Sequence, residues 1–124
     1  MKKIIKKFLN IFTIIYIKIM IKRSKVKHGI NFVLNGCPRF SGNVSFGNDC
    51  RINSGVKYNP IGGDTKARFI ANINGSIIIG NNVGISNSSI ISHSQIKIDD
   101  YVMIGGSCKI YDTDFHSLDF ENRL

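Results

Sequence analysis

An apolar residue recurs every six positions along much of the chain. From Ile73 onward the residue is isoleucine, and the only step of seven lies between Ile91 and Ile98. The series comprises Ile73, Ile79, Ile85, Ile91, Ile98, Ile104 and Ile110. An earlier block keeps the same spacing at Phe40, Phe46, Ile52 and Tyr58. A period of six fits neither a helix, with about 3.6 residues per turn, nor one long alternating strand, so it constrains the fold strongly.

This period suits a chain that makes one side of a triangular coil with each repeat. The large apolar residue of each repeat points inward, and a small or β-branched residue four places later lies inside, beside a corner. That second position holds Val44, Cys50, Val56, Val83, Ser89, Val102 and Cys108. Coils of about 18 residues then stack at about the 4.8 Å spacing of strands. The sequence predicts an all-β parallel solenoid with three stacked pairs: Ile98 over Ile79, Ile104 over Ile85, and Ile110 over Ile91.

The cysteines and one irregular segment fit into this pattern. The three cysteines form no CxxC pair, so neither a disulfide framework nor a zinc knuckle is expected. Cys50 and Cys108 fall on the small inward position and are predicted to be core thiols, reduced in a cytoplasm. Residues 59–68, with one proline and two glycines, break the phase and are predicted to form a loop at one corner. The repeats define a single domain over residues 30–124.

Residues 1–29 form a separate segment with helical spacing. The apolar stripe consists of Ile4, Ile5, Phe8, Leu9, Phe12, Ile15, Tyr16 and Ile19. The apolar run over residues 8–17 is too short to span a bilayer, which takes about 20 residues. Basic residues at Lys18, Lys22 and Arg23 stand where a signal peptide has small residues and a cleavage site. The sequence predicts a basic amphipathic helix and a short linker to the solenoid.

Two placements of this helix are open, and they are compatible. Residues 1–22 either rest on an anionic membrane surface, peripheral to the inner membrane face of a cytoplasmic protein, or cap the apolar end of the solenoid. The net charge is +9, but no acidic residue precedes Asp49, and most of the basic residues lie between Lys2 and Lys27. Nucleic-acid binders usually spread Lys and Arg over a folded face, so nucleic-acid binding is not expected.

The segment IIIGNNVGISNSSIISHSQIKIDDYVMIGGSCKIYDTDFHSLD, residues 77–119, resembles the hexapeptide-repeat acyltransferases. Within that superfamily it is most similar to the maltose and galactoside O-acetyltransferase group, which includes enzymes that acetylate capsule and lipopolysaccharide sugars. The IG-N-N-V opening is general to the superfamily, whereas the DTDFHS loop is more specific. The resemblance implies a left-handed parallel β-helix and a homotrimer. It also implies acetyl transfer from acetyl-CoA to a saccharide hydroxyl, in bacterial surface polysaccharide biosynthesis.

The resemblance places the catalytic base at His116, in a catalytic-type loop over residues 111–124. Attack of a hydroxyl on a thioester needs a base, and a neutral imidazole fits that role near pH 7. His116 follows Ile110 by six residues, so we expect it at the next corner, on the outer surface where a neighbouring subunit can face it. Asp112 and Asp114, together with Asp119, flank the histidine, and one of them is expected to hold the imidazole tautomer.

The resemblance also indicates where the acceptor and the acyl donor bind. The asparagine that contacts the acceptor in the group corresponds to Ser86, with Asn87 beside it. Because this chain has serine in place of that asparagine, it stays open whether Ser86 and Asn87 contact an acceptor or only form a turn. His93 is expected to be an outward surface residue. The coils that bind most of coenzyme A in the relatives correspond to positions beyond Leu124, so no residue here is assigned to the cofactor.

The sequence also raises three alternatives to acetyl transfer. No metal site is expected, because the possible ligands bunch on one loop and the three histidines of the related solenoid carbonic anhydrases are not matched. A truncated, non-catalytic solenoid fragment or oligomerisation module is an open alternative, since the last coil would present open strand edges. N-acylation of an amino sugar nucleotide would use the same base and also stays open.

Overall fold

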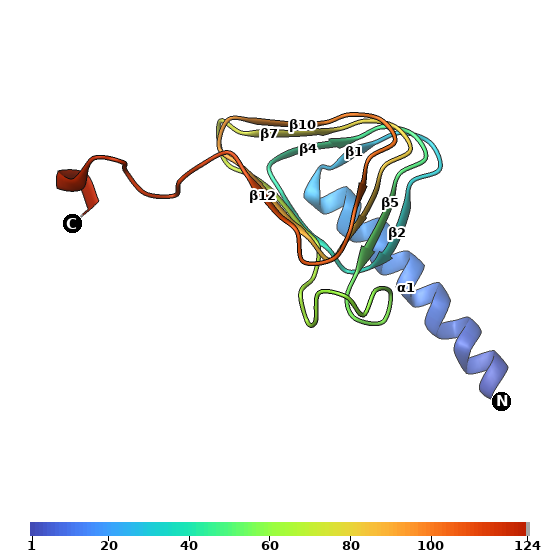
Figure 1. Cartoon of the computed structure of the whole chain (residues 1–124). Helices are drawn as coiled ribbons and strands as arrows, with labels where there is room; N and C mark the ends of the chain where they lie inside the picture. The colour runs from blue at the N-terminus through green and yellow to red at the C-terminus, as the bar shows by residue number, and fades with distance from the viewer. Residues whose placement is uncertain (124) are drawn as a thin grey trace.

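The computed structural model describes residues 1–123 as one N-terminal helix followed by short parallel strands in three sheets (Figure 1). Sheet 1 contains β1 (Lys27–His28), β4 (Asn43–Phe46), β7 (Ser76–Ile79) and β10 (Gln95–Ile98). Sheet 2 contains β2 (Val33–Gly36), β5 (Arg51–Ser54), β8 (Gly84–Ser86) and β11 (Met103–Ile104). Sheet 3 contains β3 (Arg39–Ser41), β6 (Arg68–Ala71), β9 (Ser89–Ser92) and β12 (Lys109–Tyr111). The chain visits the three sheets in turn, which is consistent with the predicted parallel solenoid.

The register confirms two of the three predicted stacked pairs. Ile98 pairs with Ile79, and Ile104 pairs with Ile85. The third prediction was wrong, because Ile110 pairs with Ile90 rather than with Ile91. The inward isoleucine Ile90 follows Ile85 by five residues instead of six. The step from Ile90 to Ile98 is correspondingly longer, because it includes the corner after β9. Spacing alone could not distinguish two adjacent isoleucines.

Large inward side chains fill the coils. Ile52, Phe69, Ile77 and Ile90 are completely buried. Nearest the helix the core is aromatic: the ring of Phe69 lies 5.2 Å from that of Phe46 and 5.3 Å from that of Phe40, between centroids. Three groups of predicted inward residues were wrong. Ile73 is completely exposed in the corner after β6, and Val56 and Tyr58 lie in a loop. In β9 the inward positions are one residue earlier than predicted: Ser88 is buried instead of Ser89, and Ile90 instead of Ile91.

The irregular segment occupies residues 55–67, between β5 and β6, and so begins four residues before the predicted loop. It folds back along the corner that joins sheet 2 to sheet 3. There the carbonyl of Ile61 leaves no room for a side chain at Gly106. Cys50 is buried as predicted, and its thiol donates to the carbonyl of Gly80 at 3.1 Å. The prediction for Cys108 was wrong, because this thiol is exposed in the last coil, where no further coil covers it among residues 1–123.

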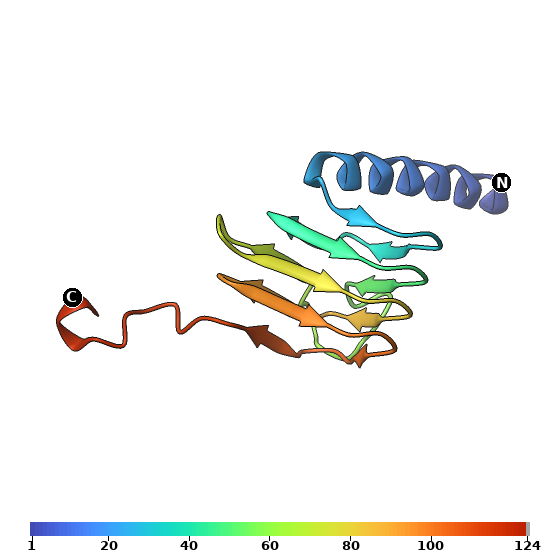
Figure 2. The ribbon, with the colours of Figure 1, turned by 90° about the horizontal axis from the view of Figure 1, so that it is seen from above.

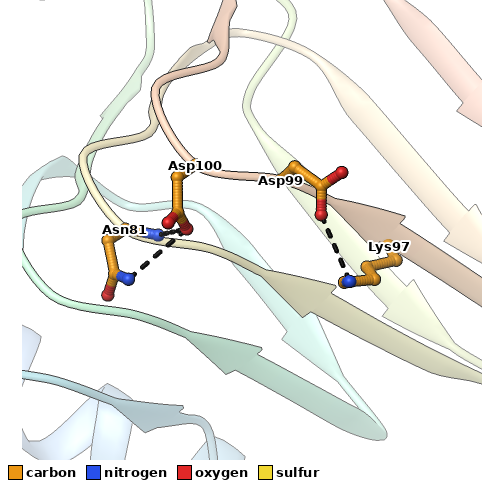
Figure 3. Close-up of polar contacts among 4 residues, drawn as sticks. All are labelled: Asn81, Lys97, Asp99 and Asp100. Atoms are coloured by element: carbon orange, nitrogen blue, oxygen red, sulfur yellow. Dashed lines mark hydrogen bonds and ion pairs between the residues drawn. The ribbon is translucent and has the colours of Figure 1, made fainter.

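A side-chain ladder explains why the corner between sheets 1 and 2 carries the IG-N-N pattern. The Oδ1 atom of Asn81 accepts from the backbone N–H of Asn48 at 2.8 Å. Asp100 Oδ1 in turn accepts from the backbone N–H of Asn81 at 2.7 Å (Figure 3). The next residue of each turn, as at Asn82 with φ 56°, has a left-handed conformation that asparagine tolerates. Lys97 and Asp99 form an ion pair of 3.3 Å that is largely exposed, so it contributes little stability.

Helix α1 (Lys2–Ser24) lies across the N-terminal end of the coils (Figure 2). Ile17, Met20 and Ile21 pack against the core, so the helix caps the solenoid through this face. The predicted apolar stripe is exposed instead. Within residues 1–123, no helix combines the length and the apolar content that crossing a bilayer requires.

Candidate functional site

Residues 112–123 leave the coils at the corner after β12 and extend away from them (Figure 1). His116 is exposed in this segment and lines a shallow hollow with Asp114, Leu118 and Arg123. The expectation of an outer-surface histidine is therefore met, but His116 lies beyond the corner rather than on it. The end of the segment is held locally, because Arg123 Nε donates to the carbonyl of Ser117 at 2.6 Å.

Asp112, which occupies the corner itself, bonds to the coil that precedes it. Its Oδ1 atom accepts from the backbone N–H of His93 at 2.6 Å. Its Oδ2 atom accepts from the hydroxyl of Ser92 at 2.9 Å and from the N–H of Ser94 at 3.1 Å. The bond from His93 has the largest effect and holds the pKa of Asp112 below its ordinary value; desolvation opposes it with the second-largest effect, and the weaker effects of the bonds from Ser92 and Ser94 lower the pKa further. Asp112 therefore stabilises the corner beneath the histidine segment.

The carboxylates do not hold the imidazole in this structure. Among residues 1–123, no hydrogen bond joins His116 to Asp112, Asp114 or Asp119. Both oxygens of Asp112 are used by the corner, so this carboxylate is already engaged elsewhere. Asp114 shares the hollow with His116 and is the carboxylate best placed to orient the ring.

A column of corner side chains supports the start of this segment, and the sequence interpretation did not identify it. Asn72 Nδ2 donates to Nε2 of His93 in the coil above it. The ring of Phe115 meets the ring of His93 edge-on at 5.8 Å and that of Tyr111 at 5.4 Å. His93 is exposed as expected, yet it forms part of this support. The signal in the sequence was the corner position that Asn72, His93 and Asp112 share after their strands.

Ser86 and Asn87 lie on another side of the coil from His116. Ser86, in β8, is half-buried on the outer face of sheet 2, and its hydroxyl accepts from Asn53 Nδ2 at 3.2 Å. Asn87 is 0% exposed, so its side chain is closed to a ligand. Its Oδ1 atom accepts from Gly55 N at 2.7 Å, and its Nδ2 atom donates to the carbonyl of Asn59 at 2.6 Å. Asn87 therefore acts as a turn-forming residue, and its buried side chain is not placed to contact an acceptor.

The outer face of sheet 2 carries a broad open groove. Its lining includes Asp49, Arg51, Asn53, Ser86 and Met103. The groove combines both signs of charge, an amide and a hydroxyl with one thioether, so it offers hydrogen-bond donors and acceptors to a polar molecule. Within one chain, the groove on sheet 2 is separate from the corner after β12, where the His116 segment begins.

The fold and these sites define a helix-capped, three-sided parallel β coil with an exposed histidine beyond its last corner. Among residues 1–123, no three His, Cys, Asp or Glu side chains are grouped to hold a metal ion. Comparisons with family models, curated proteins and solved structures find no match to this chain.

Proposed function

We propose that this chain is the solenoid of a hexapeptide-repeat O-acetyltransferase, a left-handed β-helix that acts as a homotrimer. It transfers an acetyl group from acetyl-CoA to a saccharide hydroxyl, in surface polysaccharide synthesis. The observation that supports this function best is the pairing of a three-sided coil with an exposed histidine segment at its corner. The segment around His116 carries the sequence likeness, and Asp112 attaches it to the preceding coil.

In this proposal His116 acts as the general base. One ring nitrogen takes the proton of the acceptor hydroxyl while the hydroxyl oxygen forms a bond to the thioester carbonyl carbon. The tetrahedral intermediate then collapses, the carbon–sulfur bond breaks, and the proton passes from the imidazolium to the departing thiolate. Asp114, in the same hollow, orients the ring and stabilises its charged form.

The separation of the two polar sites favours more than one subunit. His116 follows sheet 3, whereas Ser86 and the groove lie on sheet 2 of the same coil. When three of these three-sided coils pack around a threefold axis, a corner of each chain lies near a face of the next chain. A saccharide in the groove of one subunit is then within reach of the histidine of its neighbour.

The test is release of free thiol from acetyl-CoA, measured with matched hydroxyl and amino sugars as acceptors. We expect release with hydroxyl acceptors and an acetyl ester on the product. Release only with amino sugars would replace the proposal with N-acylation. A protein that releases no thiol and gives no heat with acetyl-CoA in calorimetry would be a non-catalytic module, and the proposal would be wrong.

A further inference from the structure

Most of the apolar surface of α1 is free. The helix contacts the core through Ile17, Met20 and Ile21 near its C-terminal end. Its N-terminal turns project beyond the coils (Figure 2). Phe8, with 60% of its surface exposed, and Phe12, with 67%, are uncovered. The other exposed large apolar residues of the stripe are Ile4, Ile5, Leu9, Ile15, Tyr16 and Ile19.

The N-terminal part of the free stripe and the contact face point in opposite directions. At about 100° per residue, Phe8 and Phe12 lie on one side of the helix, and Ile17 and Ile21 lie on the other. Because the contact face is turned towards the coils, the N-terminal part of the stripe is turned away from them, whereas Tyr16 and Ile19 border a hollow beside Phe40. The stripe therefore contributes nothing to the core and forms an apolar surface at the N-terminal end of the molecule.

Charge distinguishes the possible occupants of this surface. Residues 1–27 contain nine Lys and Arg and no acidic residue, while eight acidic residues balance eight basic ones in the remainder. The four N-terminal lysines, Lys2, Lys3, Lys6 and Lys7, lie on the side of the helix opposite the stripe. A second copy of so cationic a helix would be repelled. An apolar face backed by a cationic polar face is the pattern of helices that lie in an anionic membrane interface.

We propose that α1 binds the surface of an anionic membrane, with the stripe among the acyl chains and the lysines near the lipid phosphates. The helix lies flat across the first coil (Figure 2), so the axis of the solenoid stands along the membrane normal. The last coil, with the His116 segment, is then the part of the chain farthest from the bilayer. This orientation leaves the outer faces of all three sheets open to other subunits and to substrate.

The test is co-sedimentation of the full chain with vesicles of phosphatidylcholine, with or without a third of phosphatidylglycerol. We expect binding to the anionic vesicles, little binding to the neutral ones, and loss of binding in high salt. Replacing Phe8→Ser and Phe12→Ser together should weaken binding at least about tenfold, as should Lys3→Glu with Lys7→Glu. Neither pair contacts the core, so urea unfolding should not change.

Two matched controls lie outside the helix. Ile73→Ser removes a completely exposed isoleucine at a corner, and Lys66→Glu reverses an exposed charge in the loop; both should bind vesicles like the wild type. Equal binding to neutral and anionic vesicles, or binding to neither, would overturn the proposal. So would a fall in oligomeric state in the phenylalanine variant without vesicle binding, since the stripe would then join copies of the chain. These readouts need no acetyl-CoA and are independent of the proposed activity.

Discussion

Replacing Asn87 with glycine tests the role that the structure gives this residue against a role in binding the acceptor. The carboxamide bonds to Gly55 N at 2.7 Å and to the carbonyls of Asn59 at 2.6 Å and Ile61 at 3.3 Å. It is completely buried, and its backbone φ is 41°. Glycine accepts that conformation, so the substitution removes the hydrogen bonds without adding backbone strain.

The expected loss is worked from the two shorter bonds. Each contributes about 0.5–1.5 kcal/mol net, and each backbone group left buried without a partner costs about 1–3 kcal/mol. Water that enters the loosened loop recovers part of this, so we expect a loss of about 3 kcal/mol. Asn82→Gly is the matched control: its φ is 56°, and its side chain forms no hydrogen bond among residues 1–123.

Urea unfolding of both variants, followed by circular dichroism, measures the difference directly. The common entropic cost of glycine, about 0.5–1 kcal/mol, cancels between them. Limited proteolysis should cut residues 55–67 faster in Asn87→Gly only, because these bonds anchor that loop. Free energies of unfolding within about 0.5 kcal/mol of each other would refute the anchoring role.

Three further changes probe the coils and the corner. Tyr101→Asn should stabilise the protein by about 1 kcal/mol, seen as a rise in Tm, because Tyr101 has φ 62° and is largely exposed; a lower Tm would contradict this. Folding lowers the pKa of Asp112 from 3.8, chiefly through the bond from His93, so its contribution is complete above pH 3.8 and is lost as the pH falls through the lower folded-state value. Asp112→Asn should therefore flatten the acid side of a plot of unfolding free energy against pH, and an unchanged slope would count against the contact. Phe69→Ala should cost about 3–5 kcal/mol in urea unfolding, whereas Phe115→Ala, at a half-exposed ring, should cost about 1 kcal/mol or less; equal losses would contradict the placement of the core.

The six-residue period predicted the three sheets because one corner is constant. Between sheets 1 and 2 every coil uses the same short turn, so Ile79 and Ile85 keep their spacing and their partners. The other two corners vary in length, and their insertions depend on three-dimensional contacts such as the bond of Asn87 to the loop. This is why Ile73 was assigned to the core although it lies in a corner.

The site was predictable in part for a similar reason. Exposure of His116 follows from its place after the last strand, and the structure agrees. The use of Asp112 by the preceding corner was not predictable, because its partners are backbone groups of residues about twenty positions earlier. The contact face of α1 was also missed: the end of a solenoid presents no periodic pattern that could select Ile17 and Met20 over the longer apolar stripe.

The most direct test of the central claim is the rate of acetyl transfer to a saccharide hydroxyl in His116→Ala. With acetyl-CoA as donor, we expect the rate to fall about 10²–10⁴-fold, the usual contribution of a general base. His28→Ala, an exposed histidine at the opposite end of the coils, should keep the wild-type rate. Equal rates in the wild type and in His116→Ala would contradict the assignment of the base.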